Sequence, residues 1–357
     1  MSVSRKKTGD AGKGGAAQFT GDFALGTFAR EDGKAYPAMV IGSSAIDLAV
    51  AHRAYAGSAR AGGGLLSGVA SVMDLLQEWE RNFEVLQAMF AFLGEEGLDG
   101  KGLRESVSDL DQLAVLPPIQ RPSKILNCAA NYSGHLKEMR SYTQTGGNVD
   151  PEKIFKGDKS AARPYFFLKA PSSLCGAYDN IVMPSIADQV DWEAELGVAI
   201  GRRGKKLKAA NALGCVAGYM TFNDVSCRNQ LFREDRPNFR TDWLSSKSHD
   251  SFGPLGPFLV PKAFVPDHAH LKIELKVNGE TKQSGVAADM IYSTEEQIEY
   301  VSRLMTLEPG DVFATGTLAG VGQATGTFLR PGDIVETEVH GLGRQQNRVV
   351  APEEEPA

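Results

Sequence analysis

Short apolar runs separated by turns occupy most of the second half of the chain. The runs either alternate apolar and polar residues or hold a few consecutive apolar residues between Gly, Pro and Asn, and both patterns are typical of strands. They lie at residues 124–132, 164–171, 180–185, 190–201, 218–224, 271–280, 311–317 and 333–341. Asn278-Gly279, within one of these runs, is a hairpin turn signal. With few helices between them, the strands predict an α+β, β-rich fold, a mixed β-sandwich roll.

Two longer segments have the spacing of helices. In the first, apolar residues recur at steps of three and four, which places them on one helix face. They are Leu76, Trp79, Phe83, Leu86, Phe90 and Leu93. We predict that this face packs into the core; a surface for a partner protein is the alternative. The second helix is predicted to begin after an N-cap at Ser293 or Thr294 and to stop before Pro309.

The chain is predicted to form two domains between two tails. Residues 1–17 are rich in Lys, Gly and Ala and should be a disordered tail, and 351–357 read as a second, acidic tail. Residues 18–118 combine short strands with the first helix, which predicts a smaller N-terminal α/β domain. Three prolines within 116–122 suit a linker, so the larger, strand-rich domain is placed at 119–350.

Composition and charge argue against some classes of function. The chain has 357 residues, of which 42% are hydrophobic and 23% charged, as in ordinary globular proteins. A net charge of -6 argues against nucleic acid as a partner. No apolar run reaches the roughly 18 residues of a membrane span, and the four cysteines lack CxxC spacing. We therefore expect a cytoplasmic protein with reduced thiols and with neither membrane nor nucleic acid as a partner.

Three carboxylates are candidates for a metal site. Glu193 and Glu195 are two positions apart on a predicted strand, so both side chains point to the same face. Asp224 ends a second predicted strand. Like charges held together inside a protein need a cation, and carboxylate oxygens suit Mg2+, Mn2+ or Ca2+. The alternative is a solvated strand face that carries two glutamates.

Five motifs in order give these carboxylates a family context. They are NYSGHLKE at 131–138, DWEAEL at 191–196, FND at 222–224, KSHDSFGPLGP at 247–257 and LEPGDVFATGTLAGVG at 307–322. From about residue 121 onward the chain thus resembles the fumarylacetoacetate hydrolase superfamily. The resemblance implies a mixed β-sandwich roll, usually a homodimer, in which Glu193, Glu195 and Asp224 bind Mg2+ or Mn2+, with Ca2+ as a substitute in crystals.

The same resemblance implies a general base. His135 and Glu138 are three residues apart, so on a helix they share a face and can hydrogen bond directly or through one water. In the members that the chain resembles, this pair lies on a lid over the metal and deprotonates a water. Exposure or a structural role is the alternative for His135. The polar segment 140–164 looks longer than in shorter members, and it either extends the lid or is a surface insertion.

Further residues are implied to contact the substrate. Lys247 would bind the carboxylate on the metal side or stabilise the oxyanion, and Arg228 matches a substrate-binding arginine. Gln230 is a weaker candidate, with exposure as its alternative. Gly316 and Thr317 would offer donors to a substrate carboxylate, with a structural turn as the competing interpretation. The next position holds leucine where the family usually has proline.

The resemblance also implies an activity. We expect a metal-dependent hydrolase that cleaves a C–C bond in a 2,4-dioxo acid of the acylpyruvate or fumarylpyruvate type through an enolate. A small oxo acid is the expected partner. Decarboxylation of oxaloacetate-like acids, or isomerisation or tautomerisation of intermediates of aromatic catabolism, is the alternative on the same site. A non-catalytic metal-binding module is the alternative of another class.

Overall fold

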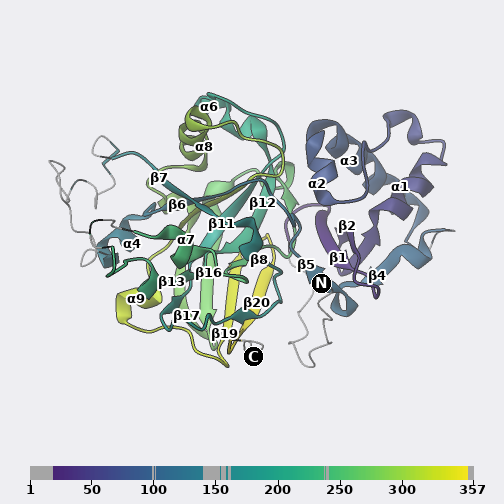
Figure 1. The fold of residues 1–357 in the computed structure, drawn as a ribbon. Helices are drawn as coiled ribbons and strands as arrows, with labels where there is room; N and C mark the ends of the chain where they lie inside the picture. The colour runs from purple at the N-terminus through teal and green to yellow at the C-terminus, as the bar shows by residue number, and fades with distance from the viewer. Residues whose placement is uncertain are drawn as a thin grey trace.

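The computed structural model of the protein describes residues 19–352 except 99, 101, 140–152, 154–157, 160, 161, 237, 239 and 240. The predicted tail at 1–17, most of the tail at 351–357 and most of the segment 140–164 lie outside the described residues. Within the described part, a smaller N-terminal unit lies beside a larger strand-rich unit (Figure 1).

The N-terminal unit is built on a five-stranded antiparallel sheet in the order β4-β3-β2-β1-β5. The strands are β1 (Ala24–Ala29), β2 (Ala35–Ile41), β3 (Ser44–Asp47), β4 (Val107–Asp109) and β5 (Ala114–Leu116). The helices are α1 (Leu48–Ala56), α2 (Val72–Gln77) and α3 (Trp79–Glu96). Together they give the small unit that the strand and helix patterns predicted.

The predicted helix around residues 76–93 is two helices. The backbone of Glu78 leaves the helical region with φ -130° and ψ 52°, so α2 ends at Gln77 and α3 begins at Trp79. The buried face of α3 also includes Val85 and Met89, so it is rotated from the predicted one. The predicted core role is confirmed all the same, because most of these side chains are buried in one hydrophobic cluster.

That cluster joins the two units. Leu25 and Met39 of the N-terminal sheet are buried together with Met220, Phe222 and Leu255 of the larger unit. Burial of apolar surface between the units stabilises their packing by about 25 cal/mol per Å2. The boundary at residue 118 stays a prediction.

A six-stranded sheet carries the larger unit, in the order β15-β12-β11-β18-β6-β7. Its strands are β6 (Ile125–Ala129), β7 (Tyr165–Lys169), β11 (Ala194–Ile200), β12 (Val216–Asn223), β15 (Val260–Pro261) and β18 (Val312–Thr317). Only β18 and β6 run parallel; the other neighbours are antiparallel.

A second sheet packs against the first, in the order β17-β16-β19-β20-β9. Its strands are β9 (Ile181–Val182), β16 (Lys272–Val277), β17 (Glu280–Val286), β19 (Ile334–Val339) and β20 (Arg344–Val350). Leu196 and Val198 of one sheet share a buried cluster with Ile273, Leu275 and Val335 of the other. The predicted β-rich sandwich roll is therefore confirmed.

Shorter elements complete the unit. The strands are β8 (Leu174–Cys175), β10 (Val190–Asp191), β13 (Ser226–Cys227) and β14 (Gly253–Pro254). The helices are α4 (Ser133–Glu138), α6 (Ala209–Ala212), α7 (Trp243–Lys247), α8 (Thr294–Leu304) and α9 (Gly322–Thr325). Figure 1 shows α6 and α8 together at one end of the unit and α4 at its side.

Local signals in the sequence account for two of these elements. Asn278 and Gly279 both have positive φ, 53° and 80°, which is the turn expected between β16 and β17. Ser293, rather than Thr294, is the N-cap of α8, because its hydroxyl accepts from Glu296 N and the Glu296 carboxylate accepts from Ser293 N.

Candidate metal centre and active site

The antiparallel pairing of β11 and β12 brings the predicted carboxylates together. Ala194 pairs with Asn223, so Glu193 and Asp224 lie next to each other just beyond the paired ends. Asp224 N donates to Glu193 O at 2.9 Å, and Glu193 N donates to the Asn223 side chain at 3.0 Å. Glu195, two residues into β11, points to the same place. One oxygen of each carboxylate lies within 4.8 Å of the others.

Three buried cations surround two of the carboxylates. Lys247 Nζ lies 2.7 Å from both Glu193 Oε2 and Asp224 Oδ2. Lys169 Nζ donates to Asp224 Oδ1 at 2.8 Å. Arg228 Nη2 lies 2.6 Å from Glu193 Oε1. Burial opposes the charge on Glu193, but Lys247 and Arg228 outweigh it and lower the pKa of this carboxyl.

Glu195 lacks such a partner. Its Oε2 accepts the backbone N–H of Gly316 at 2.7 Å, and it forms no ion pair within the part of the chain that the structure describes. Burial, with Asp224 and Glu193 as negative neighbours, raises the pKa of Glu195 well above its ordinary value. A buried carboxylate without a cation, beside two more carboxylates, fits a divalent ion with hard oxygen ligands.

The two lysines differ in charge balance. Burial lowers the pKa of Lys169, and Lys247 adds to this effect against the attraction of Asp224. Burial acts on Lys247 too, but Asp224 and Glu193 together raise its pKa. Lys247 is therefore the firmly charged ammonium of the site, whereas Lys169 loses its proton more readily.

A cavity of about 380 Å3 opens above this cluster. Its polar wall consists of Glu193, Asp224, Lys247, Arg228, His135 and Thr317. The apolar lining includes Leu136, Met139, Tyr165, Phe167, Leu231, Phe232 and Trp243. The rings of Phe167 and Trp243 stack with centroids 4.5 Å apart. The cavity thus combines charged and apolar side chains, and Lys247 Nζ lies 5.3 Å from the centroid of the Phe167 ring.

The predicted pair on α4 flanks the polar wall. His135 Nδ1 lies 3.8 Å from Glu138 Oε2, too far for a direct hydrogen bond. This nitrogen is buried and has no hydrogen-bond partner among the described residues. The Glu138 carboxylate accepts the N–H of Gly320, at 2.8 Å for the nearer oxygen. The two side chains therefore lie near each other without a direct hydrogen bond, and their role as a general base stays a prediction.

Known proteins share the sequence pattern of this chain. The profile described as "Fumarylacetoacetate (FAA) hydrolase C-terminal" matches residues 124–350. The chain belongs to the fumarylacetoacetate hydrolase family. The resemblance drawn from the five motifs is confirmed, and so is the fold it implied.

Relatives in this family have names of different activities. "Oxaloacetate tautomerase FAHD2A, mitochondrial" of Bos taurus is 40% identical over 242 residues, 67% of this chain and 70% of that protein. Among solved structures, a fumarylacetoacetate hydrolase from Exiguobacterium antarcticum is 28% identical with a TM-score of 0.67, covering 92% of this chain and 99% of that one. A 2-hydroxyhepta-2,4-diene-1,7-dioate isomerase from Mycobacterium marinum is 26% identical with a TM-score of 0.61, covering 92% and 98%. These names favour the predicted isomerase or tautomerase alternative over C–C hydrolysis.

Three residues predicted to contact the substrate have other hydrogen-bond partners in the structure, and their contacts with a substrate stay a prediction. Gln230 does not line the cavity, and its side chain donates to Ile186 O instead. Gly316 N–H is already taken by Glu195. Thr317 lines the cavity, but its hydroxyl donates to Ala194 O at 3.0 Å and accepts from Gln283. The structural-turn alternative therefore describes Gly316 better than a substrate contact.

The unusual leucine after Thr317 is accommodated within this turn. Leu318 O accepts from the side chain of Gln283 at 2.8 Å, and the leucine side chain is buried. Gln283 also accepts the N–H of Ala194. One buried amide of β17 thus ties the turn to the start of β11.

Sequence reasoning missed two residues of the site. Lys169 is the last residue of β7 and lies far along the chain from the other cations. From the sequence alone, a lysine at the end of a strand is expected to be exposed to solvent. Asp191 accepts from Arg228, Gly322 and Gln323 and is fully buried, so it fixes Arg228. Asp191 could have been chosen from the sequence, because it is the first residue of the DWEAEL motif.

Other predictions concern the protein's surroundings. In the described part of the chain no helix is long and apolar enough to cross a membrane. The cytoplasmic location, the homodimer and the choice of ion stay predictions. The four cysteines are all buried.

Proposed function

We propose that this protein catalyses keto–enol tautomerisation of a small 2-oxo acid of the oxaloacetate type at a divalent-metal centre. The observation that carries the proposal is the buried cluster of Glu193, Glu195 and Asp224 beneath a cavity that two further cations line. The tautomerase names of relatives 40% identical to the chain support the same reaction class.

The three carboxylates would hold the ion, which would polarise the 2-oxo group and favour the enolate form. Lys247 and Arg228 carry positive charge on the cavity wall, where a dianionic oxo acid needs it. Asp191 and Glu193 hold the Arg228 side chain in one orientation, so this charge is fixed before the substrate binds.

His135 is the residue that we assign to proton transfer. It lines the cavity, and its Nδ1 has no partner among the described residues. In the enol-to-keto direction the protonated imidazole gives a proton to C3, and the proton of the enol hydroxyl passes to solvent, from which the ring is protonated again, so that no other reactant is consumed. Glu138 is the neighbouring carboxylate that would stabilise the protonated ring.

C–C hydrolysis of an acylpyruvate is the second candidate, and the apolar lining favours it. Oxaloacetate is short and charged at both ends, whereas Phe167, Trp243 and Phe232 form a wall suited to an apolar acyl group. In this reaction His135 would take a proton from water that attacks the distal carbonyl. The products would be pyruvate and a carboxylic acid.

One assay separates the candidates. Metal-stripped protein is supplied with Mg2+ or Mn2+, and the decay of enol oxaloacetate is followed by its ultraviolet absorbance. Pyruvate release from acetylpyruvate and from benzoylpyruvate is measured in parallel. Metal-dependent acceleration of the enol decay without pyruvate release supports the tautomerase; pyruvate release from the acylpyruvates alone rejects it in favour of the hydrolase. Glu195→Gln should lose the activity and Glu338→Gln, on β19, should keep it.

A further inference from the structure

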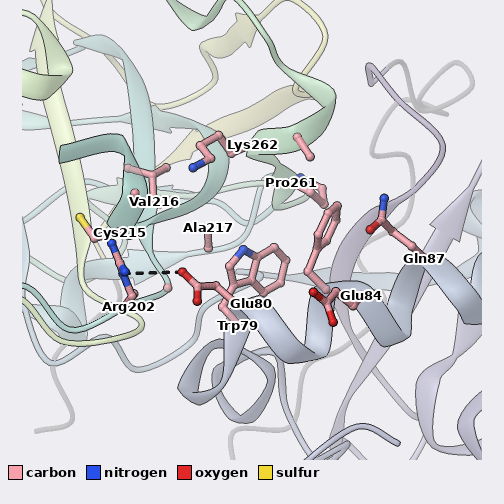
Figure 2. A pocket seen from close by; sticks show the side chains of 14 residues that line it. Trp79, Glu80, Glu84, Gln87, Arg202, Cys215, Val216, Ala217, Pro261 and Lys262 are labelled. Carbon is pink, nitrogen blue, oxygen red and sulfur yellow. Dashed lines mark ion pairs between the residues drawn. The ribbon is translucent and has the colours of Figure 1, made fainter. Parts of the chain in front are cut away.

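A second cavity lies at the other end of the strands that carry the metal centre. It has a volume of about 350 Å3 and lies between α3 and the residues where β11 ends and β12 begins (Figure 2). Glu193 and Asp224 flank the opposite ends of these strands, and a strand of seven residues spans about 23 Å. The cavity is therefore separate from the active site.

The floor of this cavity is aromatic and presents an unused donor. Trp79 is only 8% exposed, and its indole N–H forms no hydrogen bond within the part of the chain that the structure describes. Figure 2 shows this nitrogen on the edge of the ring that faces Ala217 and Lys262. Phe83 packs beside Trp79 with ring centroids 5.5 Å apart. Because Trp79 lines the cavity, an acceptor on a bound ligand can take the place of water at this N–H.

The cationic groups of the cavity are also incompletely paired. Lys262 Nζ donates to Leu213 O at 2.6 Å and forms no ion pair with any described residue. Burial lowers the pKa of Lys262, as expected for an ammonium without a counter-charge. Arg202 forms one ion pair among the described residues, with Glu80 at 3.7 Å, and both side chains are more than half exposed. Glu84 also lines the cavity and is exposed, whereas Lys262 is half-buried.

We infer that this cavity binds a small carboxylate with a flat apolar body, such as an aromatic acid. The carboxylate accepts from Trp79 Nε1 and Lys262 Nζ, and the flat body packs on the Trp79 and Phe83 rings. Gly201 packs directly against Trp79 beside the cavity, since an added Cβ would meet the Trp79 side chain at 2.9 Å. The absence of a side chain at Gly201 lets backbone and indole approach closely.

Calorimetry on metal-free protein tests the charge requirement with three matched probes, benzoate, benzamide and benzylamine. Benzoate should bind at least about tenfold more tightly than the neutral and cationic probes, since a charge-assisted hydrogen bond adds that much. Trp79→Phe removes the N–H but keeps a ring, and Lys262→Met removes the charge but keeps the stem. Each should weaken benzoate about tenfold, and the control Lys276→Met on β16 should not.

A crystal soaked with 4-bromobenzoate locates the ligand without any variant, through the anomalous signal of bromine. Bromine beside Trp79 and Lys262, with benzoate binding in solution, supports the inference. Absence of benzoate binding in solution, equal binding of benzylamine, unchanged affinity in both folded variants, or bromine elsewhere would each overturn it. Thermal melting of each variant establishes that it is folded. If a variant is unfolded, the soaked crystal of the unchanged protein tests the inference instead.

Discussion

Gly316 N–H donates to Glu195 Oε2 at 2.7 Å, and this is the one hydrogen bond of that carboxylate within the described part of the chain. The geometry requires glycine, because φ at Gly316 is +104° and an added Cβ would lie 2.6 Å from the Cβ of Asn131. The backbone of β18 therefore orients the one carboxylate of the cluster that no ammonium or guanidinium of the described residues holds.

Gly316→Ala should weaken metal binding as well as folding. The strained φ and the clash with Asn131 both shift the N–H away from Glu195, so we expect a loss of about 2–4 kcal/mol in unfolding free energy. Urea denaturation and calorimetry with Mn2+ measure the two effects. Gly33→Ala is the matched control, since φ there is +80° but nothing lies within 4 Å of the added Cβ. If both variants lose the same stability and Mn2+ affinity is intact, the contact with Glu195 does not matter.

Glu193→Gln and Glu195→Gln should change stability in opposite directions in the metal-free protein. Glu193 is paired with Lys247 and Arg228, so its loss leaves buried cations without a partner and should cost about 3–5 kcal/mol. Glu195 is a repelled carboxylate, and a neutral amide can still accept from Gly316, so Glu195→Gln should gain about 1 kcal/mol or more. Urea denaturation in the presence of a chelator measures both changes. A destabilised Glu195→Gln would show that Glu195 is neutralised by something else.

Metal affinity should rise with pH. The pKa of Glu195 is raised in the folded protein, so the folded state keeps a proton that the unfolded chain loses above about pH 4.3. Metal-free stability therefore falls as pH rises through that range toward the folded pKa, and a metal must displace the proton. Calorimetry with Mn2+ at about pH 6 and about pH 8 should give tighter binding at the higher pH. His135→Gln should keep this dependence; if it abolishes the rise, His135 and not Glu195 is the titrating group.

The contrast between Glu193 and Lys169 shows which parts of the site the sequence predicts. Alternation along one strand and a short motif are enough to place Glu193 and Glu195 together, because both depend on local geometry. Lys169 reaches Asp224 only because β7 lies at the edge of a sheet whose strand order is not local. The same holds for β20, whose RQQNRVV segment reads as polar although Gln345 and Asn347 are fully buried and hydrogen-bonded to backbone carbonyls. Buried polar residues that pair across the fold carry no periodic signal.

Trp243 should decide between substrates with and without an apolar tail. Its ring stacks on Phe167 and its indole N–H donates to the Tyr165 hydroxyl at 3.0 Å, so it is a fixed part of the apolar lining. Trp243→Ala should therefore lower kcat/KM for benzoylpyruvate about tenfold to a hundredfold, as a lost aromatic contact of about 1.4–2.8 kcal/mol implies, and should leave oxaloacetate tautomerisation nearly unchanged. Trp243→Phe should restore most of the difference, because the stacked ring remains. Trp243 also begins α7, which ends at Lys247. Equal loss of both activities in Trp243→Ala would therefore mean that the ring serves to position Lys247. A selective loss would mean that the apolar side chains of the cavity contact the distal group of the substrate.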